Sequence, residues 1–209
     1  MRRTRVKFCG LTRPEDVDAA VAAGADALGF VLWPGSRRAV DEARLAALAE
    51  RVPAFVTRVG LFVDQDPALI ERCAAHLDLL QFHGDEAPAE CARFERAWIK
   101  ALRMRDGLDL PAAVDDYAGA RALLLDAYRP GVPGGTGATF DWSRIPASLA
   151  KPVILAGGLS AANAADAIAA VAPFALDVSG GIEAAPGVKD AERMAAFMAA
   201  VHEGDARHP

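Results

Sequence analysis

The sequence predicts an α/β protein, a (β/α)8 barrel that forms a single domain over residues 1–209. Short, continuously apolar runs alternate along the chain with alanine-rich amphipathic segments. This alternation is typical of parallel strands buried on both faces and of the helices that cover them. The 209 residues, 53% of them hydrophobic, suffice for one such core, whereas two domains would each be small and no linker divides the chain.

The apolar runs predict roughly eight strands, the number that a closed barrel of this kind needs. Each run is short and is bounded by polar or turn-forming residues. The strands are expected at Arg5–Cys9, Ala25–Leu32, Arg58–Val63, Leu77–Phe82, Trp98–Leu102, Ala120–Leu125, Pro152–Leu155 and Phe174–Val178.

The start of the first helix, expected over Arg13–Ala23, is readable in detail. Thr12 is predicted to be the N-cap, and Glu15 stands three residues later, which matches a capping box. Pro14 falls in the first turn, where a missing N–H costs little. The chain is therefore expected to turn sharply just after Cys9, which leaves this cysteine at the carboxyl end of the first strand.

The remaining helices follow the other predicted strands, and one of them is weakly indicated. The segment Asp106–Asp116 is rich in turn-forming residues, and periodicity alone also allows a doubly wound open sheet. The tail Glu203–Pro209 is polar and is expected to be frayed. The clearer helices are expected at Asp41–Glu50, Pro67–His76, Asn163–Val171 and Asp190–Val201.

Charge and cysteine content exclude several classes of protein. The formal net charge of -5 at pH 7 argues against a nucleic-acid-binding protein, which usually carries a basic surplus on one face. The three cysteines form no Cys-x-x-Cys pair and show no zinc-finger spacing, so we expect a reduced, cytoplasmic protein without a metal site. No apolar run is long enough to span a bilayer, and none follows the basic N-terminus as in a signal peptide.

Two reactive side chains are predicted at the carboxyl ends of strands, where such barrels place their active sites. Cys9 ends the first strand, and Asp126 directly follows three leucines of the sixth. Asp126 is either a turn-forming or capping aspartate or a general acid. Cys9 is either a small buried hydrophobe or a base, and a base needs its pKa lowered by positive charge or a helix N-terminus. Cys73 and Cys91 fall on predicted helices and are assigned to packing.

Two glycine-containing turns indicate a phosphate site. Gly157-Gly158 ends the seventh strand and Ser179-Gly180 ends the eighth, the usual positions for phosphate binding in such barrels. Glycines let backbone N–H groups approach an anion closely. The alternative is a pair of ordinary tight turns. A third cluster at Gly134–Gly137 is predicted to be a mobile flap, and the alternatives are another phosphate loop or an ordinary long connection.

Three polar side chains at the same end of the barrel are predicted to contact a substrate. Arg38 follows the second strand and could hold a carboxylate through two hydrogen bonds, or it could be solvated surface. Gln81 and His83 flank the end of the fourth strand. His83 either orients the substrate or is a satisfied, half-buried side chain.

Short motifs follow one another in a specific order from Lys7 to Asp190, nearly the whole chain. They are Lys7-Phe8-Cys9-Gly10-Leu11-Thr12, Gly24-Ala25-Asp26-Ala27-Leu28-Gly29-Phe30 with Ser36-Arg37-Arg38, Leu80-Gln81-Phe82-His83-Gly84-Asp85-Glu86, Asp126 with Gly134-Gly135-Thr136-Gly137 and Phe140-Asp141-Trp142, Ala156-Gly157-Gly158-Leu159, and Asp177-Val178-Ser179-Gly180-Gly181-Ile182-Glu183 with Pro186-Gly187 and Lys189-Asp190. Together they resemble the phosphoribosylanthranilate isomerase family. No single motif decides the matter, but the ordered set is highly specific.

The resemblance implies a TIM barrel and a role for each matching residue. Cys9 matches the family's general base, Asp126 its general acid and Arg38 the residue that holds the anthranilate carboxylate. The turns at Gly157-Gly158 and Ser179-Gly180 match the phosphate site. The family often has a second serine where this chain has Gly180, so a hydroxyl contact is expected to be missing there.

The activity that the resemblance implies is the Amadori rearrangement of N-(5-phosphoribosyl)anthranilate in tryptophan biosynthesis, without a metal or cofactor. The expected partner is this phosphorylated small molecule, with no nucleic acid or membrane, and the chain is expected to be a monomer or homodimer. Two alternatives stay open. One is another phosphate-binding barrel enzyme, such as a pentose-phosphate epimerase. The other is a non-catalytic sugar-phosphate-binding protein, which would need the glycine turns but neither Cys9 nor Asp126.

Overall fold

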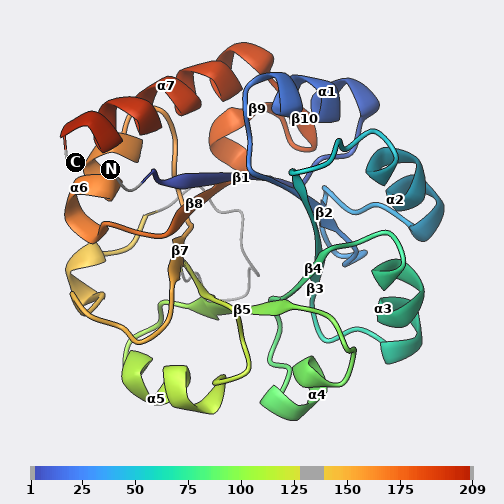
Figure 1. The fold of residues 1–209 in the computed structure, drawn as a ribbon, viewed down its shortest axis with the longest axis horizontal. Helices are drawn as coiled ribbons and strands as arrows, with labels where there is room; N and C mark the ends of the chain where they lie inside the picture. The colour runs from blue at the N-terminus through green and yellow to red at the C-terminus, as the bar shows by residue number, and fades with distance from the viewer. Residues whose placement is uncertain (1–2, 128–138, 208–209) are drawn as a thin grey trace.

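The computed structural model describes residues 3–127 and 139–207. Within them, eight parallel strands form a closed barrel in sequence order, surrounded by helices (Figure 1). The prediction of a (β/α)8 barrel is confirmed, and the open-sheet alternative is excluded. The strands are β1 (Arg5–Cys9), β2 (Ala27–Val31), β3 (Thr57–Phe62), β4 (Leu79–Phe82), β5 (Trp98–Arg103), β6 (Leu123–Asp126), β7 (Val153–Leu155) and β8 (Ala175–Val178).

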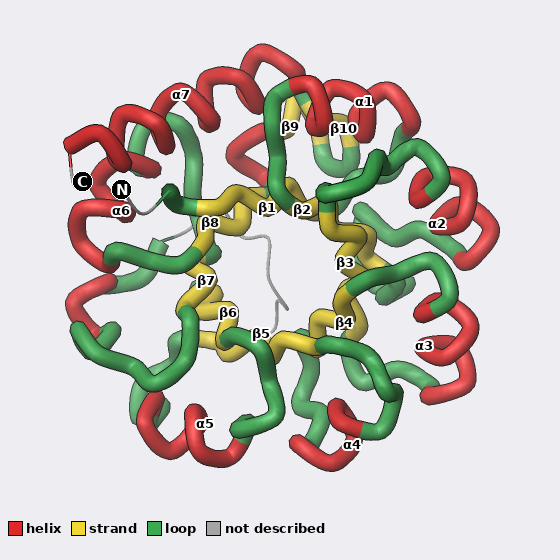
Figure 2. The backbone as a smooth tube through the Cα atoms, viewed as in Figure 1, coloured by secondary structure: helices red, strands yellow, loops and turns green. Residues whose placement is uncertain are grey.

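The barrel closes where the first strand meets the last. β1 pairs with β2 on one side, with Cys9 opposite Gly29, and with β8 on the other, with Lys7 opposite Asp177. The ring of strands is continuous in the backbone trace (Figure 2). Because all strands run parallel, their carboxyl ends meet at one end of the barrel. Each observed strand overlaps the run that predicted it.

The helices agree with the sequence pattern in most places. The weakly indicated segment does form a helix, α5, which Asp109 caps by accepting a hydrogen bond from the Ala112 N–H. The helix expected around Cys91 is the short α4, whereas two 3₁₀ turns and a small hairpin were not expected. The helices are α1 (Pro14–Ala22), α2 (Glu42–Ala49), α3 (Pro67–Ala74), α4 (Pro88–Ala92), α5 (Leu110–Asp116), α6 (Ala164–Val171) and α7 (Ala191–Arg207); the turns are η1 (Trp142–Arg144) and η2 (Gly180–Ile182), and the hairpin is β9 (Glu183–Ala185) with β10 (Val188–Lys189).

Two local predictions are wrong. The N-cap of α1 is Arg13 without a side-chain cap, because the Thr12 hydroxyl instead donates to the Gly187 carbonyl oxygen at 2.6 Å. The chain beyond residue 203 is not frayed as far as it is described: α7 continues to Arg207. This last stretch is held by Asp205, which accepts from the backbone N–H of Thr4 at 2.9 Å and from its hydroxyl at 2.6 Å.

Side chains that alternate along the strands divide the core into an inner and an outer part. Inside the barrel lie small and aliphatic side chains such as Ala101, Leu124 and Ala156. The larger outer cluster packs the helices against the barrel and contains Phe8 and Phe197 as an edge-to-face pair with ring centroids 6.2 Å apart. Buried polar groups therefore stand out on the inner face, toward its carboxyl end.

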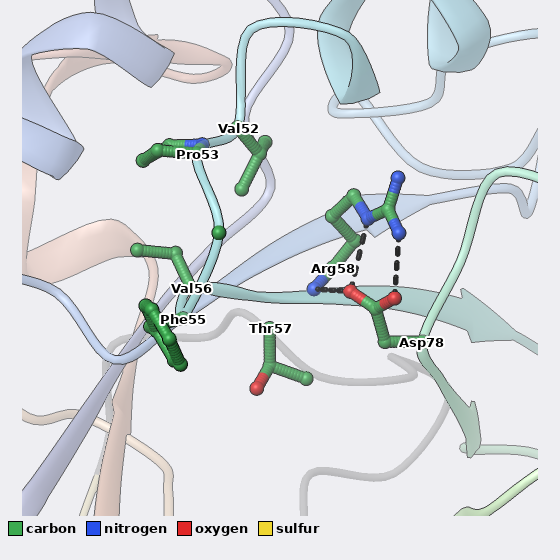
Figure 3. Close-up of a pocket in the computed structure, with 8 residues that line it drawn as sticks. Val52, Pro53, Phe55, Val56, Thr57, Arg58 and Asp78 are labelled. Atoms are coloured by element: carbon green, nitrogen blue, oxygen red, sulfur yellow. Dashed lines mark hydrogen bonds and ion pairs between the residues drawn. The ribbon is translucent and has the colours of Figure 1, made fainter.

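The opposite end of the barrel carries a smaller cavity of about 370 Å³ beside the start of β3 (Figure 3). Its polar lining is an ion pair in which Arg58 donates to Asp78 at 2.9 and 2.6 Å, tying the start of β3 to that of β4. Phe55 in the preceding turn is fully exposed and has a φ of 71°. Among the described residues, the one carboxylate that lines this cavity, Asp78, is already paired with Arg58, and no cysteine or histidine lines it. The predicted flap at residues 134–137 lies outside the described residues.

Candidate active site

One cavity of about 800 Å³ opens at the carboxyl ends of the strands and gathers most of the predicted site residues. Cys9 and Asp126, which are far apart along the chain, both line it. They come together because β1 and β6, which lie across the ring from each other (Figure 2), both finish at the carboxyl end of the barrel. The other predicted residues that line it are Arg38, His83, Gly157, Gly158, Ser179 and Gly180. Gln81 does not line it.

Cys9 is only 5% exposed and lies next to a buried ion pair. The Lys7 Nζ donates to Asp177 Oδ1 at 2.6 Å, and both side chains are almost fully buried. Burial raises the pKa of the Cys9 thiol, the Lys7 charge opposes this rise, and the Asp177 charge adds to it. The lowered pKa that a base at Cys9 needs is not present in the free protein, because desolvation outweighs the neighbouring cation.

Lys7 nevertheless remains a cation in this position. Burial is the largest single influence and would lower the pKa of its ammonium group, but the charges and hydrogen bonds of Asp177 and Cys9 together outweigh it, so the net direction is upward. A fixed positive charge next to a thiol stabilises the thiolate, which is the form that can accept a proton. The site thus contains a thiol that is mostly protonated when free and a cation that stabilises its ionised form.

Asp126 ends β6 and is 6% exposed. Its Oδ1 accepts from the backbone N–H of Ala127 at 2.9 Å, and its Oδ2 lies 3.2 Å from Nε2 of His83. These two contacts fix the plane of the carboxyl group at the cavity wall. The local sequence explains the position, because three fully buried leucines place the aspartate at the end of the strand with no freedom to slide.

Gln81 lies beneath His83 rather than in the cavity. Its side chain is fully buried, and its Nε2 lies 3.0 Å from Nδ1 of His83. The prediction that Gln81 contacts the substrate directly is therefore not supported. Because β4 alternates inward at 81 and 83, the two side chains stack along the inner face of the barrel.

Arg38 already holds one carboxylate in this structure. Its Nε and Nη2 donate to the two carboxyl oxygens of Glu183, both at 2.7 Å. Glu183 also accepts from the Lys189 Nζ at 2.9 Å and from the Gly187 N–H at 3.1 Å. Burial acts to raise the pKa of Glu183, but the bonds from Arg38 and Lys189 outweigh it and lower the pKa overall. The arginine is thereby oriented toward the cavity from the hairpin side.

The two glycine turns differ in what they require. Gly157 and Gly158 adopt φ values of 85° and 62°, which favour glycine, and a Cβ at Gly157 would lie 2.5 Å from the Ala127 backbone nitrogen. At Gly181 a Cβ would collide with the carbonyl oxygen of Leu159. Gly180 is different, since the nearest atom to its Cβ position is Arg38 Nη2 at 3.7 Å. A side chain would fit there.

Lys189 supports the eighth-strand turn from below. Its Nζ donates to the Ser179 carbonyl oxygen at 3.1 Å and lies 3.3 Å from the Ser179 hydroxyl. Burial lowers the pKa of Lys189 overall, although its bond to Glu183 acts in the opposite direction. The turn at Ser179 therefore carries a neighbouring cation as well as glycine backbone.

Sequence reasoning assigned no role to four charged groups that build the site: Lys7, Asp177, Glu183 and Lys189. A signal for the first two was present, because each is a charged residue at an inward position of an apolar strand. No local signal pairs them, since their separation along the chain is 170 residues. Glu183 and Lys189 lie in a hairpin that was not predicted.

The described residues contain neither a metal-binding cluster nor a membrane-spanning helix. Over residues 3–127 and 139–207, no group of three or more His, Cys, Asp or Glu side chains could hold a metal ion. In the same part of the chain, the helices are all too short or too polar to cross a membrane.

Comparison with known proteins agrees with this geometry. The family model of N-(5'-phosphoribosyl)anthranilate isomerase matches residues 6–200. The N-(5'-phosphoribosyl)anthranilate isomerase of Chromohalobacter salexigens is 73% identical over 201 residues, 96% of this chain and 95% of its own. Two solved relatives cover 96% of this chain and 99% of theirs. One is a phosphoribosyl anthranilate isomerase in complex with reduced 1-(O-carboxyphenylamino)-1-deoxyribulose 5-phosphate, 34% identical with a TM-score of 0.82.

The other solved relative is a monomeric variant of the dimeric phosphoribosylanthranilate isomerase from Thermotoga maritima, 33% identical with a TM-score of 0.81. The resemblance expected from the motifs is confirmed by the family model and by the identity to the Chromohalobacter protein. The matched residues, 6–200, include every residue that lines the cavity, from Cys9 to Pro186. This chain therefore belongs to the N-(5'-phosphoribosyl)anthranilate isomerase family.

Proposed function

We propose that this chain isomerises N-(5'-phosphoribosyl)anthranilate to 1-(2-carboxyphenylamino)-1-deoxyribulose 5-phosphate in tryptophan biosynthesis, with Cys9 as general base and Asp126 as general acid. The observation that carries the proposal is that both side chains line one cavity, which two glycine turns and Arg38 also line. A sugar phosphate with a carboxylate at its other end matches this arrangement of groups. The complex of the solved relative supports the choice of ligand.

The reaction proceeds by two proton transfers, one at the ring oxygen and one at C2, the two ring neighbours of C1. Asp126 donates its proton to the furanose ring oxygen, the bond from that oxygen to C1 breaks, and the nitrogen lone pair forms a protonated Schiff base. The Cys9 thiolate then removes the proton from C2, which gives a neutral enolamine that tautomerises to the aminoketose. Solvent returns the proton from the thiol to the carboxylate. Each transfer by a positioned side chain accelerates the reaction by about 100- to 10,000-fold.

Hydrogen-bond donors at the rim of the cavity hold the two anionic ends of the substrate. Glu183 accepts two of the five N–H donors of Arg38, which leaves the others for the anthranilate carboxylate. The turns at Gly157-Gly158 and Ser179-Gly180 offer backbone N–H groups to the phosphate, with His83 at the side of the sugar. Fixing both ends positions C2 and the ring oxygen between base and acid, which lowers the entropic part of the barrier.

Loss of substrate fluorescence tests the activity directly. The wild-type protein is expected to turn over N-(5'-phosphoribosyl)anthranilate, and Cys9→Ala and Asp126→Asn are each expected to reduce kcat by about 100-fold or more. Cys91→Ala and Asp109→Asn are matched controls on the outer helices and should retain activity. Near-normal kcat in Cys9→Ala or Asp126→Asn would remove that residue from the mechanism.

Absence of turnover in the wild-type protein would favour the non-catalytic sugar-phosphate-binding alternative. Calorimetry with the product then separates the two readings, since a binding protein retains affinity for the product in Cys9→Ala and Asp126→Asn alike. Loss of activity on treatment with EDTA would instead favour a metal-dependent barrel enzyme. The proposed mechanism predicts no effect of EDTA.

The oligomeric state and the cellular location complete the proposal. A monomer or homodimer is proposed, and the dimeric Thermotoga relative supports the second form. Light scattering of the wild-type protein and of Phe55→Ser distinguishes them, because a dimer whose contact includes this fully exposed side chain would be weakened. A cytoplasmic location is proposed from the unpaired cysteines expected of a reducing compartment, and cell fractionation tests it.

A further inference from the structure

Three buried polar side chains form a line that ends at the acid. Gln81 Nε2 lies 3.0 Å from His83 Nδ1, and His83 Nε2 lies 3.2 Å from Asp126 Oδ2. The exposed fractions of the three side chains are 0%, 7% and 6%. At this burial, solvent cannot rearrange the hydrogen bonds freely, so each donor must face an acceptor.

The direction of these hydrogen bonds follows from the glutamine. With its amide nitrogen toward His83, Gln81 donates and Nδ1 accepts, so the ring proton of a neutral imidazole is on Nε2. Within the described residues, Gln81 Oε1 has no hydrogen-bond partner. Exchanging the two amide atoms would place the NH₂ group in that unpartnered position. A buried N–H without an acceptor is less tolerated than a carbonyl oxygen, which favours the first orientation.

This direction decides where a shared proton resides. When the pair of His83 and Asp126 holds one extra proton, it is either a neutral imidazole with a carboxylic acid or an imidazolium with a carboxylate. The second form needs a proton on Nδ1, which would point at the N–H donor of Gln81. Hydrogen bonding to the neutral form of a group disfavours its charged form. The amide therefore opposes transfer of the proton from acid to imidazole.

We infer that Gln81 is a positioning residue that keeps His83 neutral with its proton on Nε2, so that the acidic proton stays on Asp126. His83 then donates to the carboxylate that forms when Asp126 has protonated the substrate. The inference rests on the proposed function of Asp126 as an acid. It also explains why a fully buried amide lies beneath the cavity without lining it.

Other charged groups near His83 come from several strands. Arg103 of β5 donates to the His83 carbonyl oxygen at 3.0 Å, and therefore contacts its backbone rather than its ring. Cys9 of β1 and Asp177 of β8 line the same cavity. In the described part of the chain, the recorded hydrogen-bond partners of the imidazole nitrogens are Asp126 and Gln81.

Long-range ¹H–¹⁵N NMR of the imidazole nitrogens tests the inference without using activity. Wild-type His83, assigned by comparison with His83→Asn, is expected to carry one proton on Nε2 at neutral pH. In Gln81→Glu, a carboxylate faces Nδ1, so the doubly protonated ring is expected to be populated. In Gln81→Met, which keeps the volume but removes the donor, the two tautomers are expected to mix.

The same variants are expected to lose kcat rather than affinity. A residue that acts through another typically costs about 10- to 100-fold when it is removed. We expect such a decrease in kcat for Gln81→Glu and a smaller one for Gln81→Met, with KM near the wild-type value. Gln65→Met is the matched control, since Gln65 is a glutamine that donates to the Leu32 carbonyl oxygen at 2.6 Å and does not line the cavity.

Two results would overturn the inference. One is a wild-type His83 with its proton on Nδ1, and the other is a Gln81→Met variant with unchanged tautomer and unchanged kcat. Circular dichroism shows which variants are folded, and the wild-type spectrum remains decisive if Gln81→Glu is not. Failure of the proposed function is distinguishable, since it would appear as absent wild-type turnover, whatever the tautomer.

Discussion

Cys9 and Asp126 differ in the charge of the side chains that surround them. On the side of β1 and β8, Cys9 lies next to a buried ion pair of Lys7 with Asp177. On the side of β4 and β6, Asp126 is contacted by an imidazole whose other nitrogen faces an uncharged amide. We call these the base side and the acid side of the cavity.

The difference follows from what each group must do. In the proposed mechanism Cys9 must lose its proton before it can act as a base, and a cation at its side lowers the free-energy cost of forming the thiolate. A carboxyl group that acts as an acid must keep its proton until the substrate takes it, so a cation there would release the proton too early. Neutral hydrogen-bond partners suit the acid side, and a paired charge suits the base side.

The largest effect is expected when the base side loses its cation. Lys7→Met leaves the buried carboxylate of Asp177 without its partner, which should lower the free energy of unfolding by about 3–5 kcal/mol. Loss of the charge beside Cys9 should also reduce kcat/KM by about 10- to 100-fold. Urea denaturation and the fluorescence assay measure the two effects.

A second variant separates stability from catalysis. Lys7→Met combined with Asp177→Leu removes both charges, and should recover most of the stability but little of the activity. Recovery of both together would contradict the comparison, because it would show that the ion pair is only structural.

The next effect concerns the ionisation of Cys9. Because burial raises the pKa of this thiol in the free protein, its alkylation by iodoacetamide should be slow at neutral pH and should increase about tenfold per pH unit toward alkaline pH. Mass spectrometry identifies the modified cysteine. A reaction rate that is already constant with pH near neutrality would mean that Lys7 outweighs desolvation even without substrate.

A smaller effect is expected from the cysteines outside both sides of the cavity. Burial raises the pKa of Cys73 to about 11 and that of Cys91 to about 12. In the unfolded chain a thiol loses its proton near pH ~8.5, so above that value the folded state binds more protons than the unfolded state. The free energy of unfolding should therefore decrease as pH rises, by up to about 1.4 kcal/mol per pH unit for each thiol, and be unaffected below.

Urea denaturation at increasing pH measures this slope. Cys73→Ala should reduce the slope even though it lowers the absolute stability, and the difference from wild type removes the contribution of other groups that titrate in the same range. Identical slopes in the two proteins would contradict the prediction.

The smallest effect is expected at the turn proposed to bind the phosphate, which belongs to neither the base side nor the acid side of the cavity. Gly180→Ser adds a hydroxyl in open space and should form one hydrogen bond to the substrate phosphate, worth about 0.5–1.5 kcal/mol, or a decrease in KM of about 2- to 10-fold. Gly181→Ser is the contrasting control, since its Cβ collides with the Leu159 carbonyl oxygen. An unchanged KM in Gly180→Ser would place the phosphate elsewhere.

Much of this arrangement could be predicted from the sequence because its signals are local. Apolar runs located the strands, and their last residues located Cys9 and Asp126 at the shared end. The glycine turns after the seventh and eighth strands were predicted for the same reason. What was missed depends on contacts between distant residues. Thr12 bonds to Gly187 instead of capping its helix, because a partner far along the chain competes for its hydroxyl.

The contacts that surround Cys9 and Asp126 were also missed because they join distant parts of the sequence. Nothing near Lys7 in the sequence indicates Asp177, and the sequence does not show how deeply the barrel buries Cys9, which raises the pKa of this thiol. Arg38 does form a two-bond contact with a carboxylate, but the partner in the free protein is Glu183, from a hairpin without a clear pattern, and its contact with the anthranilate carboxylate stays a prediction.

The pairing of β1 with β8 has a consequence for how the protein is made. Lys7 leaves the ribosome early, whereas Asp177 follows 170 residues later, so a nascent chain contains the thiol and its cation long before their counterion. Contacts between such distant segments form late, because closing a long loop carries a large entropic cost. Recovery of enzymatic turnover during refolding should therefore lag behind helix formation and report the moment at which the ring of strands is sealed.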